Sequence, residues 1–153
     1  MPVKKRLDEA FDEIMTAILD KLEAEAVAGG RLEGIEEVVR GDRSRPRPNV
    51  PAIWVFAERA NPDPNPRTIA ETWTLPISLT AIYKSDDPEE GQKESTRFSA
   101  LARSVVIEDR SLGLREFVQD TRSGHFEPSG PHHNRGSLWG SVAQVVVKFV
   151  TCE

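Results

Sequence analysis

Apolar and polar residues alternate along Thr72-Trp-Thr-Leu-Pro-Ile-Ser-Leu-Thr-Ala-Ile-Tyr83. Odd positions carry apolar or aromatic side chains, and even positions carry threonine, serine or proline, with Ile82 as the exception. Successive side chains of a strand point to opposite faces of a sheet, so this pattern predicts a strand with one buried and one solvated face. Pro76 has no N–H to donate to a ladder, so we expect it at an edge or a bulge.

Four other segments have the composition of strands. Pro51–Ala57 is apolar on both sides, as expected of a central strand covered on both faces. Leu138–Val150 has apolar residues at most odd positions, which predicts a second long strand with one buried face. Gly34–Arg40 and Glu116–Thr121 are shorter candidates. The segment Asn61–Pro66 lies between two of the predicted strands, Pro51–Ala57 and Thr72–Tyr83. Its three alternating prolines predict a stiff, extended loop that forms neither a helix nor a β-ladder.

Two amphipathic helices are predicted. From Val3 to Val27, apolar residues recur at spacings of three and four, and Gly29-Gly30 ends the helix. A second helix follows Asp87, the expected N-cap, with Pro88 as its first residue and Glu90 completing a capping box. It should run to about Val106 and pack on the sheet. The side chains expected in this contact are Trp73, Leu75, Ile77 and Leu79 on the strand, and Phe98, Leu101 and Val105 on the helix.

These segments together predict one α+β domain over residues 1–153. The sheet should be mixed and largely antiparallel, with about four to five strands, and the N-terminal helix and the second helix should pack against it. The length and a hydrophobic content of 38% suit a globular chain that buries a real core.

Composition and charge exclude several classes of protein. No apolar run approaches the roughly 20 residues that span a bilayer, and no secretory signal follows the basic start, so we expect a cytoplasmic protein without a membrane partner. Cys152 is the only cysteine, which excludes an internal disulfide and suits a reducing compartment. The net charge of −5 argues against general nucleic-acid binding.

An arginine cluster stands out against this acidic background. Four arginines lie within eight residues, at Arg40, Arg43, Arg45 and Arg47. Pro46 separates the last two arginines, and Pro48 follows them. Guanidinium groups form paired hydrogen bonds with carboxylates, so the segment could contact an acidic partner surface, or it could be a solvated loop. We take the four arginines as candidate partner-contact residues.

Catalytic and metal-binding patterns were sought in the same way. His125, His132 and His133 lie in the glycine- and proline-containing segment 121–137, which we expect to be a long loop, but their spacing fits no common zinc site. The sequence also lacks a phosphate-binding glycine loop and a nucleophile elbow. We therefore expect no catalytic residue, no cofactor and no metal, and we do not expect an enzyme. A chelator should change neither the melting temperature nor the oligomeric mass.

The order of the segments resembles that of the tail-terminator proteins (minor tail or tail-completion proteins) of long-tailed bacteriophages. Pro51–Val55 is similar to the Pro-Ala-Ile strand of that family, and Thr72–Tyr83 is similar to its next strand, which begins near a tryptophan. Leu138–Phe149 is similar to its closing strand, which begins with Leu-Trp and a small residue. These are strand patterns, so the resemblance carries no individual binding residue across.

The resemblance implies a small α+β domain assembled as a hexameric ring. Such a ring docks on the last ring of the tail tube, stops its growth and presents a surface to the head–tail connector or neck protein. The partners would be other copies of the chain, the tail tube protein and the connector, and the location would be the virion tail after assembly in the host cytoplasm. Segments 40–49 and 121–137 are longer and richer in arginine or proline than the family pattern.

Two alternatives stay open at this point. The chain could be a neck or head-completion adaptor of the same assembly pathway, or a small-molecule-binding or enzymatic α+β domain. A stable ring would separate the assembly proteins from the last class.

Overall fold

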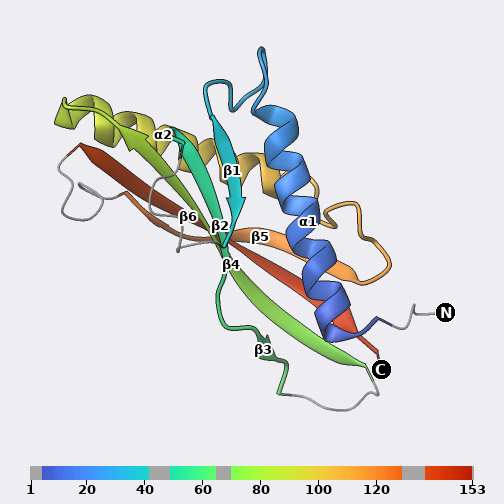
Figure 1. The fold of residues 1–153 in the computed structure, drawn as a ribbon. Helices are drawn as coiled ribbons and strands as arrows, with labels where there is room; N and C mark the ends of the chain where they lie inside the picture. The colour runs from blue at the N-terminus through green and yellow to red at the C-terminus, as the bar shows by residue number, and fades with distance from the viewer. Residues whose placement is uncertain (1–4, 42–48, 65–69, 129–136, 153) are drawn as a thin grey trace.

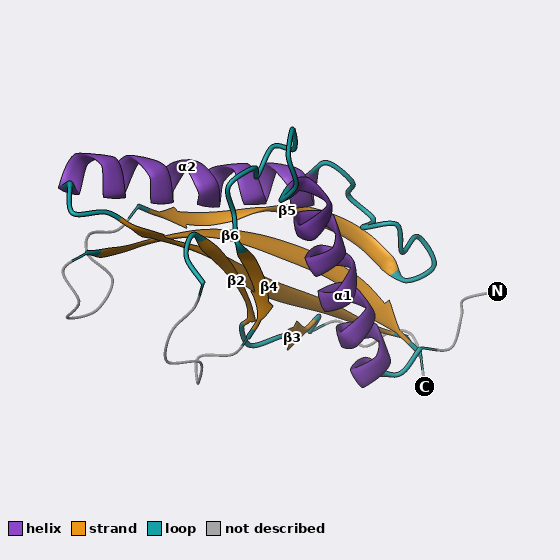
Figure 2. Cartoon of the chain, turned by 45° about the horizontal axis from the view of Figure 1, so that its top comes forward, coloured by secondary structure: helices purple, strands orange, loops and turns teal. Residues whose placement is uncertain are grey.

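A computed structural model describes residues 5–41, 49–64, 70–128 and 137–152 (Figure 1). Its elements in chain order are α1 (Leu7–Glu25), β1 (Glu37–Arg40), β2 (Ala52–Ala57), β3 (Asn61–Pro62), β4 (Glu71–Lys84), α2 (Pro88–Ile107), β5 (Val118–Glu127) and β6 (Leu138–Thr151). The strands form one sheet in the order β1-β2-β4-β6-β5, with the short β3 also paired to β4. Only β1 and β2 run parallel among these pairs. Both helices lie on the same side of the sheet (Figure 2). The predicted α+β class is confirmed.

The antiparallel pair β4 and β6 forms the centre of the sheet. The pairing runs from Glu71 opposite Thr151 to Lys84 opposite Leu138. Both strands are therefore as long as the alternating patterns predict. Their odd-numbered side chains face the helices and form the middle of the core. The fully buried or nearly buried members are Leu75, Ile77, Leu79, Ala143, Val145, Val147 and Phe149.

The second helix covers this face with the predicted stripe. Phe98 and Val105 are buried, and so are Ala102 and Val106. The predicted core contact is therefore confirmed for most of its members. Trp73 on β4 and Leu101 on α2 are only half-buried at its margin.

The other face of β4 is not solvated along its whole length. Ser78, Thr80 and Ile82 are buried, so the predicted wet face is wrong in the middle of the strand. The registers explain the difference, because β4 is flanked on both sides and bulky neighbours on β2 cover its small even-numbered side chains. Trp54 lies opposite Thr80 and Phe56 lies opposite Ser78.

Pro76 lies between the ends of β2 and β3. The rungs nearest to it join Ala57 to Ile77 and Asn61 to Thr74. The connecting segment is thus one residue longer than the stretch of β4 that it faces, as in a bulge. The Glu58 N–H donates to the Pro76 carbonyl at 2.8 Å, so the side of Pro76 that lacks an N–H faces this irregular segment. The expectation for Pro76 is confirmed.

Two predicted loops contain strand. Asn61 and Pro62 pair with β4, although the alternating prolines predicted no ladder there. This pairing is possible because proline is tolerated in a short edge strand. The segment 121–137 also begins as strand, because β5 continues to Glu127 and includes His125. Register shifts after Val118 and Ser123 break the alternation of β5, which is why its pattern is weak in the sequence.

The N-terminal helix is shorter than predicted at its C-terminal end. It ends at Glu25, and Gly29 and Gly30 follow in the turn, where a Cβ on Gly30 would lie 2.2 Å from the Glu25 carbonyl oxygen. A glycine is therefore required at position 30. In the part of the chain that the structure describes, neither helix is long and apolar enough to cross a bilayer.

The start of α2 matches the predicted cap in part. Asp87 accepts a hydrogen bond from the Glu89 N–H at 3.0 Å, and Pro88 is the first helical residue, as expected. The predicted capping box is wrong, because the Asp87 N–H donates to Ser85 Oγ. The Glu90 carboxylate instead accepts from Tyr83 Oη and Ser85 Oγ, both at 3.1 Å, and so ties α2 to the end of β4.

Replacing Asp87 with alanine should lower the free energy of unfolding by about 0.5–2 kcal/mol, because the Glu89 N–H loses its acceptor. The control is Asp86→Ala, which removes an exposed carboxylate one residue earlier and should change stability by less than about 0.5 kcal/mol. Urea denaturation of both variants measures the difference. Equal effects would mean that the cap contributes nothing.

Candidate functional site

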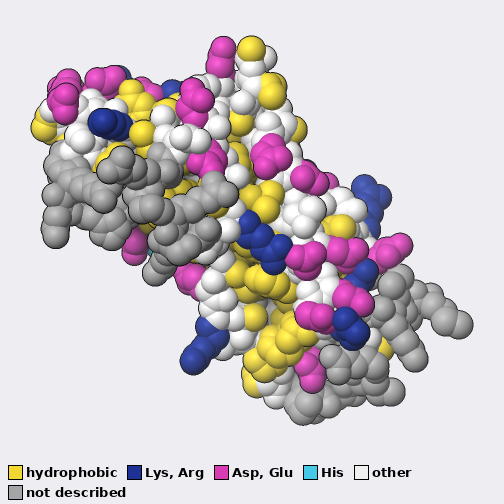
Figure 3. Space-filling model, in the orientation of Figure 1, with side chains coloured by type: hydrophobic (Ala, Val, Ile, Leu, Met, Phe, Trp, Pro, Cys, Tyr) yellow, Lys and Arg dark blue, Asp and Glu magenta, His cyan; other side chains and the backbone are white. Residues whose placement is uncertain are grey.

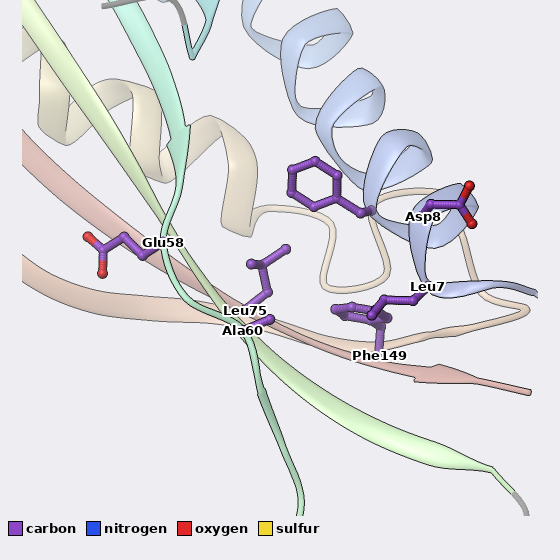
Figure 4. Close-up of a pocket in the computed structure, with 7 residues that line it drawn as sticks. Leu7, Asp8, Glu58, Ala60, Leu75 and Phe149 are labelled. Atoms are coloured by element: carbon purple, nitrogen blue, oxygen red, sulfur yellow. The ribbon is translucent and has the colours of Figure 1, made fainter.

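An apolar groove of about 500 Å³ lies between the N-terminal half of α1 and the sheet (Figure 4). Leu75 of β4 and Phe149 of β6 contribute its floor, and Leu7 and Phe11 of α1 line it from the side of the helix. The remaining lining residues are Asp8, Glu58 and Ala60. Most of this surface is hydrocarbon, so the groove suits an apolar group of a partner better than a small polar ligand.

The groove exists because β2 and the segment that follows it both leave the sheet next to the N-terminal half of α1. β2 ends at Ala57, and the bulged segment through Ala60 leaves the sheet before the two-residue β3 begins. Towards the C-terminus of α1, the apolar side chains Ile14, Ile18 and Leu22 are fully buried. Towards its N-terminus, Leu7 and Phe11 lie on the same apolar side of the helix but are only half-buried.

Acidic side chains border the groove. In Figure 3, hydrophobic surface beside the lower half of α1 is bordered by Asp and Glu side chains. Asp8 accepts from Arg6 Nε at 3.1 Å and Nη2 at 3.0 Å, and this hydrogen-bonded guanidinium lowers the pKa of the Asp8 carboxyl. Lys5 Nζ lies 2.6 Å from Glu13 Oε2, and the hydrogen bond to Glu13 raises the pKa of Lys5. Asp8 and Glu13 therefore each have a cation of the same chain beside them.

Glu58 lies at the opposite end of the groove, near the other face of the sheet (Figure 4). Its two oxygens accept hydrogen bonds from Ser78 Oγ at 2.6 Å and from Gln144 Nε2 at 3.0 Å. These bonds link the bulged segment to β4 and β6 and hold the carboxylate in place. The sequence contains no signal for this role, because the contact depends on where β2 ends.

Arg40 is the candidate contact residue that the structure describes. Its position in β1 is opposite Val55, whose side chain faces the helices, so Arg40 also faces α1. Its Nη1 donates to Asp12 Oδ1 at 2.6 Å, and its guanidinium lies 5.3 Å from the centroid of the Phe11 ring. The other three candidates, Arg43, Arg45 and Arg47, lie outside the described residues.

The histidines are not brought together by the structure as far as it describes them. His125 is exposed on β5, with Nε2 3.6 Å from Glu127 Oε1, whereas His132 and His133 lie outside the described residues. Within residues 5–41, 49–64, 70–128 and 137–152, no group of three or more His, Cys, Asp or Glu side chains is placed to hold a metal ion. Cys152 is half-buried next to the start of the chain, where its backbone N–H donates to the Lys5 carbonyl.

Comparison with known protein families and curated proteins found no match: no family model matches the chain, and no curated protein matches it.

Proposed function

We propose that this chain is a structural protein of a phage or prophage tail that forms a ring, expected to be hexameric, at the end of the tail tube. The ring stops polymerisation of the tube and provides the surface for joining the head. In this proposal the protein acts by binding other proteins, is not an enzyme, and is located in the virion tail after assembly in the host cytoplasm.

The observation that carries the proposal is the apolar groove beside an acidic helix. The buried side chains of Leu75 and Phe149 form the floor of this groove, and the half-buried Leu7 and Phe11 of α1 leave apolar surface at its side for a partner. Concentrated apolar surface with a polar border is typical of protein–protein contact sites. A sheet with two helices packed against it is also consistent with the small α+β domain that the resemblance to tail terminators implies.

The edge strands of the sheet are poorly suited to pair with the edge strand of another copy, which favours assembly through side-chain contacts. β1 is only four residues long, and β5 carries two register shifts along its ten residues. Short strands and bulges are features that prevent edge-to-edge pairing. Copies of the chain would therefore meet through surfaces such as the groove.

The test is the oligomeric mass of the purified protein followed by a capping assay. Sedimentation and negative-stain imaging should show closed rings of about six copies of the 17.1-kDa chain, the number that the resemblance implies. Added to growing tail tubes, these rings should stop elongation. A protein that stays monomeric at all accessible concentrations, with or without tubes, would contradict the proposal. Rings that bind the head connector but not tubes would favour the neck adaptor.

A further inference from the structure

The groove beside α1 has room for an apolar group more than it needs a counter-charge. The carboxylates on the nearby turns of α1 already have cations of the same chain beside them, namely Lys5, Arg6 and Arg40. Most of the groove lining is apolar, and its volume of about 500 Å³ is ample for an aromatic side chain. The group that fits this groove best is therefore a large apolar one.

The same chain offers two exposed side chains of this kind. Among the described residues, the large hydrophobic side chains that are exposed are Val27, at 55%, and Phe126, at 36%. Val27 follows the end of α1, and Phe126 lies near the end of the edge strand β5. An exposed apolar side chain that complements an apolar pocket elsewhere on the same molecule favours contact between copies.

Phe126 is accompanied by a positive charge. The Arg103 guanidinium of α2 lies 5.4 Å from the centroid of the Phe126 ring, and its Nη1 donates to the Gly124 carbonyl at 3.3 Å. This cation is thus held by a ring and a backbone carbonyl, neither of which neutralises it. A copy that presents Phe126 to a partner presents a guanidinium group beside it.

Val27 is accompanied by negative charge. The last turn of α1 contains Glu23 and Glu25 and no basic residue. Arg31 pairs with Glu25, but it is shared with Glu108, so the acids outnumber the bases here. A copy that presents Val27 to a partner presents carboxylates beside it.

The charge at the groove favours Phe126 over Val27. Glu58 lies at one end of the groove, and its two oxygens accept hydrogen bonds from Ser78 Oγ and Gln144 Nε2, which are both neutral donors. These bonds hold the carboxylate without compensating its charge. A guanidinium group that approaches this end of the groove is attracted, whereas a carboxylate is repelled.

Phe126 cannot reach the groove of its own chain. It lies opposite Ala143 of β6, whereas the floor of the groove is formed by Phe149 of the same strand. At about 3.3 Å per residue, these two positions of β6 are about 20 Å apart. The Phe126 ring can therefore enter only the groove of another copy.

We propose that the groove receives the Phe126 ring of a neighbouring copy of this chain. The inference rests on the proposed ring and specifies the contact between its subunits: Phe126 covers the apolar floor, and Arg103 comes to the end of the groove where Glu58 lies. The two surfaces of this contact differ, so each copy offers one groove and one aromatic ring. A head-to-tail contact of this kind closes into a ring of subunits when the rotation between copies permits.

Phe126→Ala should weaken self-association of the full-length protein by about tenfold or more, because the contact loses its aromatic anchor. Val27→Ala is the matched control, since it shortens the other exposed hydrophobic side chain and should assemble like wild type. Thermal melting checks that both variants are folded, and sedimentation measures self-association. Assembly of Phe126→Ala at the strength of wild type would overturn the inference.

Filling the groove tests the other side of the contact. Ala60→Trp adds an indole ring at a residue that lines the groove and should also weaken self-association by about tenfold or more. Ala24→Trp adds the same ring at an exposed position of α1 outside the groove lining and should have little effect. Combining Ala60→Trp with Phe126→Ala should weaken association no further, because both changes remove one contact. Additive losses would show two separate surfaces and contradict the inference.

Crosslinking between two proteins detects the contact directly. In a Cys152→Ser background, one protein carries Phe126→Cys and a second carries Leu7→Cys, so that each has a single thiol. A short bismaleimide should join the two proteins when they are mixed. Val27→Cys, used in place of Phe126→Cys, should give a clearly lower yield. Equal yields would mean random collision and would contradict the contact.

The outcomes separate this inference from the ring proposal. If wild type forms no ring but the thiols at positions 7 and 126 crosslink selectively, the ring proposal fails and the groove contact stands. If rings form and persist in both Phe126→Ala and Ala60→Trp, the ring stands and the groove contact is wrong. Groove variants that keep rings but lose tube capping would assign the groove to the tube protein, which also overturns the inference.

Discussion

Replacing Ile77 with alanine should lower the free energy of unfolding by about 2–5 kcal/mol, since a buried aliphatic side chain is truncated and leaves a cavity. Ile77 is 0% exposed at the middle of β4. It lies opposite Ala57 on one neighbouring strand and Val145 on the other, and α2 packs on the same face. The surrounding strands are paired on both sides, so the site has little freedom to collapse around the smaller side chain.

Leu101→Ala is the matched control for this variant. The sequence pattern predicts that both side chains are buried, but Leu101 is half-buried at the margin of the core, so its truncation should cost clearly less. Urea denaturation followed by tryptophan fluorescence measures both free energies. If Ile77→Ala has the same free energy of unfolding as wild type, the assignment of the buried face is wrong.

Gly91→Ala should destabilise the protein, although alanine normally stabilises a helix relative to glycine. A Cβ at position 91 would lie 2.3 Å from Cδ1 and 2.4 Å from Nε1 of Trp139. The indole ring has little freedom to move aside, because its N–H donates to the Ser85 carbonyl at 3.0 Å. Overpacking costs about 1–3 kcal/mol or more, which exceeds the gain of about 1 kcal/mol in helix propensity. The net loss should reach about 2 kcal/mol when the Trp139 hydrogen bond also breaks.

Gln92→Ala is the control, because it places alanine at the next, exposed position of the same helix and should leave stability nearly unchanged. Tryptophan emission should also shift in Gly91→Ala alone as Trp139 moves. A variant that is more stable than wild type would show that the helix propensity gain dominates and that α2 can move away from β6.

The long regular elements could be predicted from the sequence because their periodicity is strong. β4 and β6 each contain many alternating residues, and the boundaries of β4 were predicted to within one residue at either end. The pattern determines which way a side chain points but not how many neighbours flank the strand. Ser78 is therefore buried by the residues beside it, on a face that the pattern predicted to be wet.

The candidate site could be predicted only in part. The arginine cluster pointed to an acidic partner, and the structure places Arg40 against Asp12 of its own chain. The groove itself has no sequence signal, because it depends on the level at which β2 ends relative to α1 and on the extra residue in the segment from Glu58 to Ala60. Such relations between distant elements are set by packing, which periodicity does not encode.

The pairing of β4 with β6 also constrains the order in which this protein can fold. Trp73 of β4 and Thr151 of β6 are hydrogen-bonded although they lie 78 positions apart in the chain. On the ribosome, β4 therefore emerges long before β6, its partner in the sheet. The apolar face of β4 cannot be fully buried until synthesis has passed residue 151. Closing so long a loop carries an entropic cost that must be met before the contacts form, so folding should be slow for a domain of this size. The exposed strand is meanwhile a natural substrate for chaperones.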